Sequence, residues 1–281
     1  MFSLFSNAKI NLFLKITGKR PDGYHELETI IVPIGLADTM TFSDHPDIVM
    51  TCDDPALPVD SRNLVVKAAN LLREKSGVQK GATIQLQKKI PIGAGLGGGS
   101  SNATHALKGL NQLWKLGLGD EELEKFAGEL GSDAAFFVRN RPAFATGRGE
   151  KLQPLRVDEP IPLLLLNFGF GSSTAWAYKN FIPGKNGSPK TPAKPVLNRV
   201  TAAKLLWNDL EKPVFQKFPI LPMALEFLKK QAGVYGVMMS GSGSTLFAVL
   251  ESEKAGPKLV QAVREKYSGE VWTCLTQIPQ G

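Results

Sequence analysis

Five of the seven residues from Gly93 to Gly99 are glycine, and this run constrains the fold more than any other feature of the chain. It lies between an alternating segment, residues 83–90, and residues 102–116, which have the spacing of an amphipathic helix. Glycine lets successive backbone N–H groups turn toward one point because no Cβ blocks positive φ, and a helix N-terminus adds further donors. The run therefore predicts a phosphate-binding loop that opens a helix. The alternative is a glycine loop with a purely structural role, whose ordering would carry a large entropic cost.

The sequence does not match three common classes of nucleotide-binding motif. Gly93, Gly95 and Gly98 have the spacing of a dinucleotide-binding fingerprint, but no second strand that ends in an acidic residue follows about 20 positions later. A P-loop would need lysine in place of Gly99. The His-Arg-Asp and Asp-Phe-Gly triplets of protein kinases are absent from the sequence. What remains is a lysine-free glycine loop that ends in two serines.

Periodicity and turn residues predict alternating strands and helices along the rest of the chain. We expect strands at residues 10–16, 27–32, 163–168, 235–239, 246–250 and 271–276, and helices at residues 64–76, 120–130, 201–211, 221–232 and 259–266. Ser61 and Asp120 are the expected N-caps of the first two of these helices. Residues 152–162 are polar and contain proline, so we expect an α+β protein with two domains, residues 1–155 and 156–281.

Several polar and aromatic side chains occupy positions that suit a functional site. Asp133 follows an expected helix end and precedes an apolar run, which suits a general base, although such an aspartate is more often a turn residue or a helix cap. Lys9 and Asn11 alternate along one strand and so share a face that could meet a ligand; a solubilising lysine on an edge strand is the alternative. Tyr24 and His25 follow a glycine turn, which could present them to a cleft or leave them as partly buried framework.

The glycine loop resembles the Pro-x-x-x-Gly-Leu-Gly-Ser-Ser motif of the GHMP small-molecule kinases. Within that group the chain is most similar to the 4-diphosphocytidyl-2-C-methyl-D-erythritol kinase family. The other segments that match this family, in order, are residues 8–14, 22–27, 131–137, 145–150 and 240–245. One departure is Ala134-Ala135, where the family more often has Val-Pro. The resemblance implies a two-domain fold, with an N-terminal domain like that of ribosomal protein S5 and a C-terminal ferredoxin-like α/β sandwich.

The resemblance also implies roles for individual residues. Asp133 would be the catalytic base, and Lys9 would pair with it at the accepting hydroxyl. Asn63, which could otherwise be only a helix cap, would approach adenine. The implied ATP-binding residues are Asn63, Pro91, Ile92, Gly93, Ala94, Gly95, Leu96, Gly97, Gly98, Gly99, Ser100 and Ser101. The implied substrate-binding residues are Asn11, Tyr24, His25, Thr174 and Tyr178, of which the two tyrosines and the histidine would form a cytidine site.

The implied reaction is ATP-dependent phosphorylation of the 2-hydroxyl group of 4-diphosphocytidyl-2-C-methyl-D-erythritol, in the non-mevalonate route to isoprenoids. ATP and Mg²⁺ are the expected cofactors, and the sequence identifies no protein ligand of the metal. Three alternatives stay open: another GHMP kinase that acts on homoserine, mevalonate or a sugar; a dinucleotide-dependent oxidoreductase; and a non-catalytic nucleotide- or RNA-binding module. Tyr24, His25 and Tyr178 argue against the first, since those acceptors carry no pyrimidine to stack.

Composition narrows the class of protein further. The 281 residues are 43% hydrophobic and carry a formal net charge of +7, which suits an anionic ligand but equally an ordinary basic surface. Basic residues are dispersed, so we expect no nucleic-acid partner. No apolar stretch could span a bilayer, and the N-terminus lacks the pattern of a signal peptide. We therefore expect a cytoplasmic protein, a monomer or weak homodimer, with Cys52 and Cys274 as buried thiols.

Overall fold

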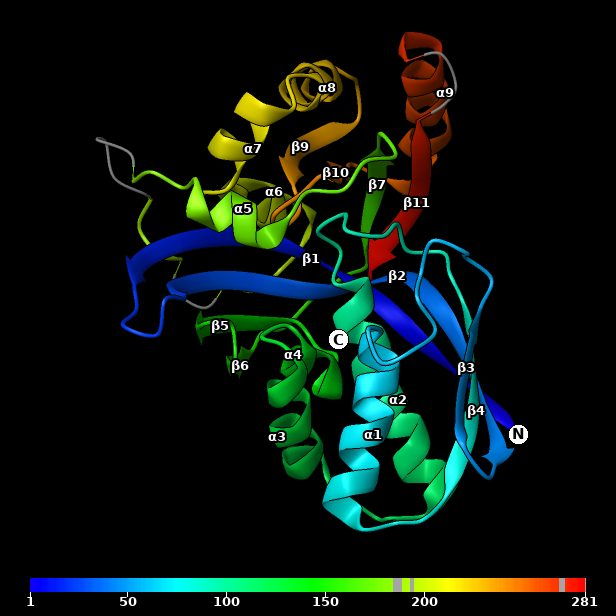
Figure 1. The fold of residues 1–281 in the computed structure, drawn as a ribbon. Helices are drawn as coiled ribbons and strands as arrows, with labels where there is room; N and C mark the ends of the chain where they lie inside the picture. The colour runs from blue at the N-terminus through cyan, green and yellow to red at the C-terminus, as the bar shows by residue number, and fades with distance from the viewer. Residues whose placement is uncertain (184–188, 193–194, 268–270, 281) are drawn as a thin grey trace. The chain divides into compact units, whose positions relative to one another are not determined.

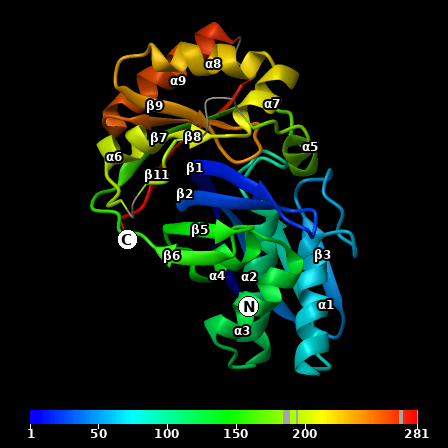
Figure 2. The same ribbon diagram turned by 90° about the vertical axis from the view of Figure 1, so that its left-hand side faces the viewer.

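The computed structural model describes residues 1–183, 189–192, 195–267 and 271–280 (Figures 1 and 2). The chain divides into two compact units, each built from separate segments. Unit 1 comprises Met1–Ala8, Leu36–Ile90 and Gly97–Asn140, and unit 2 comprises Lys9–Gly35, Pro91–Leu96 and Arg141–Gly281. Two long strands, β1 (Phe2–Lys19) and β2 (His25–His45), contribute residues to both units.

Unit 1 is a sheet with helices packed in a common core. Strand β4 (Gly81–Gln87) pairs in parallel with β3 (Ile48–Cys52) and antiparallel with residues 39–45 of β2. The helices are α1 (Leu64–Ser76), α2 (Gly98–Trp114), α3 (Asp120–Leu130) and α4 (Ala134–Arg139). Helices α1 and α2 lie side by side (Figure 1) and bury their apolar faces together with the fully buried Phe42.

Unit 2 contains a four-stranded antiparallel sheet in the order β11-β7-β10-β9, formed by Trp272–Ile278, Ile161–Asn167, Leu246–Leu250 and Val234–Met239. Helices α8 (Ile220–Lys229) and α9 (Gly256–Lys266) cover it (Figure 2) and share its apolar core. The remaining strands are β5 (Ala143–Gly147), β6 (Lys151–Pro154) and β8 (Trp207–Asn208), which extend the pairing of β1 and β2. Helices α5 (Thr174–Lys179), α6 (Arg199–Leu205) and α7 (Glu211–Lys217), with the 3₁₀ turn Glu253–Ala255, complete the unit.

The strand predictions are confirmed, but several helix ends differ from expectation. Asn63, not Ser61, caps α1, because its side chain accepts a hydrogen bond from Val65 N. Gly119 is the N-cap of α3, so Asp120 is its first helical residue rather than its cap. The helix after the glycine run begins at Gly98, within the glycines themselves.

The expected helix at residues 201–211 is wrong in its second half. Helix α6 ends at Leu205 because Leu206 takes an extended backbone, and the next two residues form β8. Trp207 pairs with Phe13 in parallel, so sheet pairing overrides local helix propensity there. The two cysteines, expected to be buried, are half-buried free thiols. The domain boundary after residue 155 stays a prediction, since the compact units are sets of segments rather than two halves of the chain.

Candidate functional site

The glycine run has the backbone that its composition predicts. Gly93, Gly95 and Gly97 have φ values of 63°, 78° and 70°, a region that side chains with a Cβ rarely adopt. Gly97 is the N-cap of α2 and, lacking a side chain, leaves the first turn of the helix uncapped. The first turn of a helix has N–H groups without intrahelical acceptors, and the helix dipole adds positive potential there. The start of α2 in unit 1 can therefore donate to an anion.

In unit 2, the first part of the glycine run is held by three other segments. Ser240 Oγ donates to Gly95 O at 3.0 Å, and Thr245 N donates to Ala94 O at 3.1 Å. A Cβ on Gly95 would lie 2.1 Å from Ser240 O, so only glycine fits this close approach. Gly93 O accepts from Ser172 N, and Leu96 O accepts from Lys9 N, both at 2.9 Å. The turn at residues 241–244 and its flanking residues thus lie beside Ala94 and Gly95 of the glycine run.

Lys9 and Asn11 form the start of a buried polar row on β1. Lys9 Nζ donates to Asn11 Oδ1 at 2.7 Å, Asn11 Nδ2 donates to Thr29 Oγ1 at 2.8 Å, and that hydroxyl donates to Phe13 O. Lys9 and Asn11 are each only 4% exposed, so the interpretation of Lys9 as a solubilising edge lysine is wrong. A buried ammonium needs such partners because desolvation of an unpaired charge is costly. The shared face predicted for these two residues is confirmed.

Asp133 lies in unit 1, at the residue before α4, and is half-buried. It occupies a turn at the N-cap position, as the alternative interpretation expected, but it has helical dihedral angles and its side chain makes no capping hydrogen bond. Helix α2 fixes this neighbourhood, because Thr104 Oγ1 donates to the carbonyl oxygen of Ala134 at 2.8 Å. A Cβ on Gly131 would lie 4.0 Å from Ser100 Oγ, which places the residues before Asp133 beside the first turn of α2.

Asn63 caps α1 and lies near the start of α2. Its Oδ1 accepts from Val65 N at 2.9 Å while its Nδ2 donates to Pro58 O at 2.7 Å. A Cβ on Gly99 would meet Leu64 Cδ1 at 3.7 Å, so the first residues of α1 and α2 are neighbours. The cap role is therefore confirmed, and the approach of Asn63 to adenine stays a prediction.

The three aromatic side chains predicted to bind cytidine, Tyr24, His25 and Tyr178, contribute to two separate ring contacts in unit 2. His25 stacks on Tyr178 with ring centroids 5.3 Å apart, whereas the guanidinium of Arg148 lies 4.9 Å from the centre of the Tyr24 ring. Burial and the nearby Lys19 lower the pKa of His25 from its ordinary value of 6.5, which favours the neutral ring at pH 7. Thr174 Oγ1 is 2.9 Å from Ser242 Oγ and so connects α5 to the turn that holds Gly95.

Local sequence patterns give no individual role to Arg148, Ser240, Thr104 or Asp38. Arg148 and Ser240 lie within segments that match the family, residues 145–150 and 240–245. The match therefore pointed to these segments but not to a role for either residue. Thr104 is one more small residue on the inner face of an amphipathic helix. Only the fold shows that its hydroxyl reaches the carbonyl next to Asp133.

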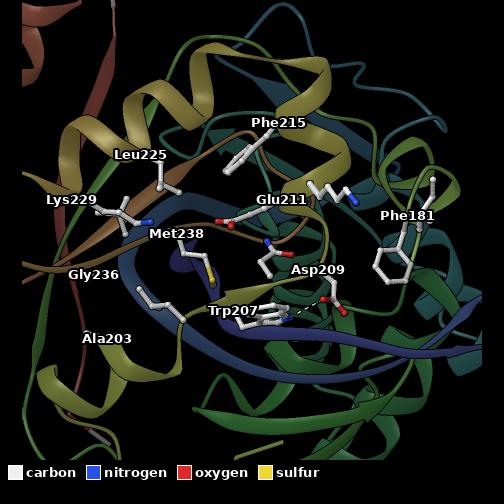
Figure 3. A pocket seen from close by; sticks show the side chains of 15 residues that line it. Phe181, Ala203, Trp207, Asp209, Glu211, Phe215, Leu225, Lys229, Gly236 and Met238 are labelled. Atoms are coloured by element: carbon white, nitrogen blue, oxygen red, sulfur yellow. Dashed lines mark hydrogen bonds between the residues drawn. The ribbon is translucent and has the colours of Figure 1, made fainter. Parts of the chain in front are cut away.

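Unit 2 also has an open pocket of about 570 Å³, shown in Figure 3, which contains none of the predicted site residues among its described lining. Glu211 lies in its wall, and burial raises the pKa of this carboxyl to about 7 although Met239 N donates to it at 2.9 Å. Asn208 donates from the same wall to Met239 O and Gly241 O, both at 2.8 Å. The pocket therefore backs onto the strand end and turn that support Gly95.

The described part of the chain includes no group of three or more histidine, cysteine, aspartate or glutamate side chains that could hold a metal ion. It also includes no helix with the length and apolar character needed to cross a membrane.

Comparison with known proteins adds family matches. The family model of the GHMP kinases N terminal domain matches residues 63–141, and that of the GHMP kinases C terminal matches residues 198–269. A 4-diphosphocytidyl-2-C-methyl-D-erythritol kinase of Synechococcus sp. (strain JA-3-3Ab) is 45% identical over 264 residues, which are 89% of this chain and 85% of the relative. One from Prosthecochloris aestuarii (strain DSM 271 / SK 413) is 38% identical and covers 94% of each chain.

Solved structures agree with these matches. A crystal structure of 4-(cytidine 5'-diphospho)-2C-methyl-D-erythritol kinase superposes with a TM-score of 0.81 at 33% identity and covers 100% of both chains. A mevalonate kinase superposes with a TM-score of 0.74 at 15% identity, a likeness of fold alone. The two-domain fold that the sequence predicted, a GHMP kinase N-terminal domain followed by a C-terminal domain, is confirmed.

Proposed function

We propose that this chain, which belongs to the 4-diphosphocytidyl-2-C-methyl-D-erythritol kinase family of GHMP kinases, transfers the γ-phosphoryl group of ATP to the 2-hydroxyl of 4-diphosphocytidyl-2-C-methyl-D-erythritol. The product would feed the non-mevalonate route to isoprenoid precursors. The observation that most supports a nucleotide kinase is the glycine N-cap of α2 with its positive φ. The first-turn donors of α2 would bind the ATP phosphates, and Asn63 would approach the adenine.

In the proposed reaction, Asp133 is the general base. Its carboxylate accepts the proton as the O–H bond of the acceptor breaks. The hydroxyl oxygen then forms a bond to the γ-phosphorus, while the bond from that phosphorus to its bridging oxygen breaks and ADP leaves. Lys9, whose ammonium group donates to Asn11, would stabilise the negative charge that develops on the acceptor oxygen. Backbone donors and the helix dipole would stabilise charge on the phosphoryl oxygens.

Magnesium would neutralise phosphate charge during the transfer. Mg²⁺ in kinases takes many of its ligands from substrate phosphates and water, with only one or two carboxylates from the protein. A site without a cluster of three acidic or histidine side chains among the described residues fits that mode of binding.

The acceptor would be selected by its cytosine. The stacked pair His25 and Tyr178 offers an aromatic face, and the neutral imidazole can hydrogen-bond to a base edge. The guanidinium of Arg148 lies beside the exposed ring of Tyr24, the residue before His25, and adds a positive charge there. Homoserine, mevalonate and sugars offer no ring to stack, which makes other GHMP kinase activities less suited to this chain.

The proposal extends to the state of the protein in the cell. We place it in the cytoplasm as a monomer or weak homodimer, with a small molecule rather than nucleic acid as its partner. The dispersed basic residues and the family of the chain support this assignment.

The experiment that tests this function is a coupled ADP-release assay with one enzyme sample and a panel of acceptors. We expect turnover with the cytidyl substrate and at least 100-fold lower kcat/KM with homoserine, mevalonate and galactose. A thermal-shift measurement runs beside it, in which ATP–Mg²⁺ should raise the melting temperature and NAD should not. Preferred turnover of another acceptor would replace the proposed substrate, and stabilisation by NAD alone would support the oxidoreductase alternative.

A further inference from the structure

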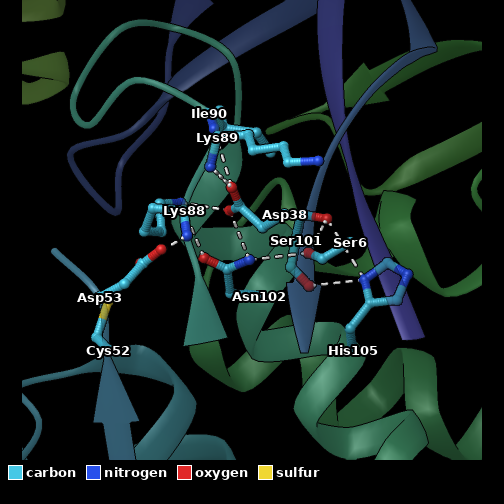
Figure 4. Close-up of polar contacts among 10 residues, drawn as sticks. All are labelled: Ser6, Asp38, Cys52, Asp53, Lys88, Lys89, Ile90, Ser101, Asn102 and His105. Atoms are coloured by element: carbon cyan, nitrogen blue, oxygen red, sulfur yellow. Dashed lines mark hydrogen bonds and ion pairs between the residues drawn. The ribbon is translucent and has the colours of Figure 1, made fainter. Parts of the chain in front are cut away.

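Asp38 on β2 is the centre of a buried polar cluster in unit 1 (Figure 4). Its side chain is fully buried, and its two carboxylate oxygens accept four hydrogen bonds. Oδ1 accepts from Lys89 N at 2.7 Å and Ile90 N at 2.9 Å. Oδ2 accepts from Lys88 Nζ and from Asn102 Nδ2, the latter at 2.9 Å. The carboxylate thus has the partners that a buried charge requires.

These donors come from the two sides of the glycine run. Lys88, Lys89 and Ile90 directly precede Pro91, where the predicted ATP-binding loop begins, and Asn102 directly follows Ser101, where that loop ends. Asp38 therefore joins the entrance and the exit of the loop through one side chain. Asn102 completes the link, because its Oδ1 accepts from Lys88 Nζ at 3.3 Å.

The cluster continues to the last serine of the loop. Asn102 Nδ2 donates to Ser6 Oγ at 2.9 Å, and Ser6 Oγ donates to Ser101 Oγ at 2.8 Å. His105, one turn further along α2, contacts Ser101 O through Nδ1 at 2.9 Å. Burial lowers the pKa of His105 to about 4, so its ring is neutral and adds no charge to the cluster at pH 7.

We infer that Asp38 is a positioning residue for nucleotide binding, because it fixes both ends of the glycine loop before the phosphates arrive. A segment with five glycines has many accessible backbone conformations, and a ligand that must order it loses affinity. Fixing the ends shortens the free part of the loop and lowers that cost before binding, in addition to the hydrogen bonds that hold residues 93–96. This inference rests on the proposed function only in assigning the loop to the phosphates of a nucleotide.

The test uses charge exchange across the contact between Asp38 and Asn102. Asp38→Asn keeps an oxygen for Lys89 N and Ile90 N but turns an N–H toward the donors Lys88 and Asn102. The double variant Asp38→Asn/Asn102→Asp restores complementarity, since the carboxylate introduced at position 102 would accept from the amide introduced at position 38 and from Lys88. It would also accept from the Ser6 hydroxyl, which turns from Ser101 and accepts the Ser101 hydrogen in return. We expect Asp38→Asn to weaken ADP binding at least 10-fold by calorimetry and the double variant to recover to within about threefold of the parent.

A matched control separates positioning from loss of stability. Trp114→Phe removes a buried hydrogen bond, Nε1 to Gly81 O at 3.0 Å, at the opposite end of the same helix. Its melting temperature should fall, but its ADP affinity should stay within twofold of the parent. The KM for the acceptor should likewise stay within threefold in Asp38→Asn, while the KM for ATP rises.

The outcomes separate this inference from the proposed function. ADP affinity is measured without any acceptor, so a wrong acceptor assignment leaves this result intact. If Asp38→Asn binds ADP within threefold of the parent, or if Trp114→Phe weakens ADP binding by a similar factor, the positioning role is refuted. Failure of the double variant to recover affinity, with a restored melting temperature, would also overturn it.

Discussion

Lys9 donates a hydrogen bond to Asn11 over 2.7 Å in the interior of unit 2, two residues apart on one strand. The pair places an ammonium where water is largely excluded, since each side chain is 4% exposed. In such surroundings a charge interacts more strongly with developing charge than it would in water. The arrangement suits catalysis better than surface solubility.

We expect Lys9→Met to lower kcat about 10²-fold or more while ADP affinity changes little. Methionine keeps the length of the side chain and removes its charge, so the loss should appear in the transition state. Lys15→Met is the matched control, because Lys15 lies on the same strand and pairs with Glu28 at 3.7 Å. Steady-state kinetics and calorimetry measure both effects. A Lys15→Met enzyme as slow as Lys9→Met would indicate general damage to β1 instead.

Asp133→Asn should lower kcat by about 10²–10⁴-fold, the usual scale for loss of a general base. The amide has the shape of the carboxylate, and Thr104 still holds the adjacent carbonyl of Ala134, so the fold of α4 should persist. Binding of ADP and of the acceptor should change far less than turnover. Asp120→Asn, at the start of α3, serves as the control. Retention of more than a tenth of the parent rate would mean that Asp133 is not the base.

Local sequence patterns predicted the elements of the fold but not how distant elements meet. The glycine run, the strand before it and the helix after it follow from backbone freedom and hydrophobic period, and Lys9 and Asn11 share a face because strands alternate. Asp38 and Asn102 are 64 positions apart, and nothing in either local segment indicates that they bond. The same holds for Thr104 and Ala134, which are 30 positions apart.

The sequence predicted the wrong helix end where tertiary contacts compete with helix propensity. Residues 206–210 continue a helical pattern, yet Trp207 and Asn208 pair with β1, and Asp209 N also donates to Leu14 O at 3.0 Å. Arg148 shows the same limit at the candidate site. It lies in a matched motif, but its contact with Tyr24 depends on β2 pairing with β5, which aligns Leu27 with Gly147.

Gly97→Ala should weaken ADP binding more than tenfold, because a Cβ at φ 70° strains the N-cap of α2 beside the proposed phosphate donors. Gly77 provides a close control, since its φ is 69° and nothing lies within 4 Å of a Cβ there. Gly77→Ala should carry a similar backbone cost, about 1–2 kcal/mol, with unchanged ADP affinity. Calorimetry and thermal melts of the two variants measure the difference. Equal ADP affinities would contradict the phosphate-loop assignment.

We expect the folded state to become less stable as pH rises, because the buried carboxyl of Glu211 must lose its proton. Burial raises the pKa of its carboxyl from 4.5 to about 7, so between these values the folded state binds more protons than the unfolded state. The free energy of unfolding therefore falls as pH rises across this window, by up to about 3 kcal/mol at 1.36 kcal/mol per unit of pKa. Glu211→Gln removes this dependence and can still accept from Met239 N. In thermal melts, the melting temperature of the variant should rise relative to that of the parent between pH 5 and pH 8. An equal difference in melting temperature at the two pH values would exclude the effect.

Tyr178→Ala should raise the KM for the cytidyl acceptor about 10-fold or more, with little change in the KM for ATP. Loss of a base-stacking aromatic side chain costs about 1–3 kcal/mol, and this substitution also removes the ring on which His25 stacks. Tyr235→Ala, an exposed tyrosine of β9, is the control and should change neither KM.

The same site should distinguish cytosine from uracil. Cytosine presents an amine donor where uracil presents a carbonyl, so groups arranged for one base are left unpaired by the other. We expect the uridyl analogue to have a kcat/KM at least 10²-fold lower than the cytidyl substrate. This ratio should shrink in His25→Phe, which keeps a stacking ring but cannot hydrogen-bond to the base edge. Competition assays with both acceptors measure the ratio directly. Equal use of the two acceptors by the parent enzyme would show that the pair His25 and Tyr178 does not read the base, and would return the choice of acceptor to the wider GHMP kinases.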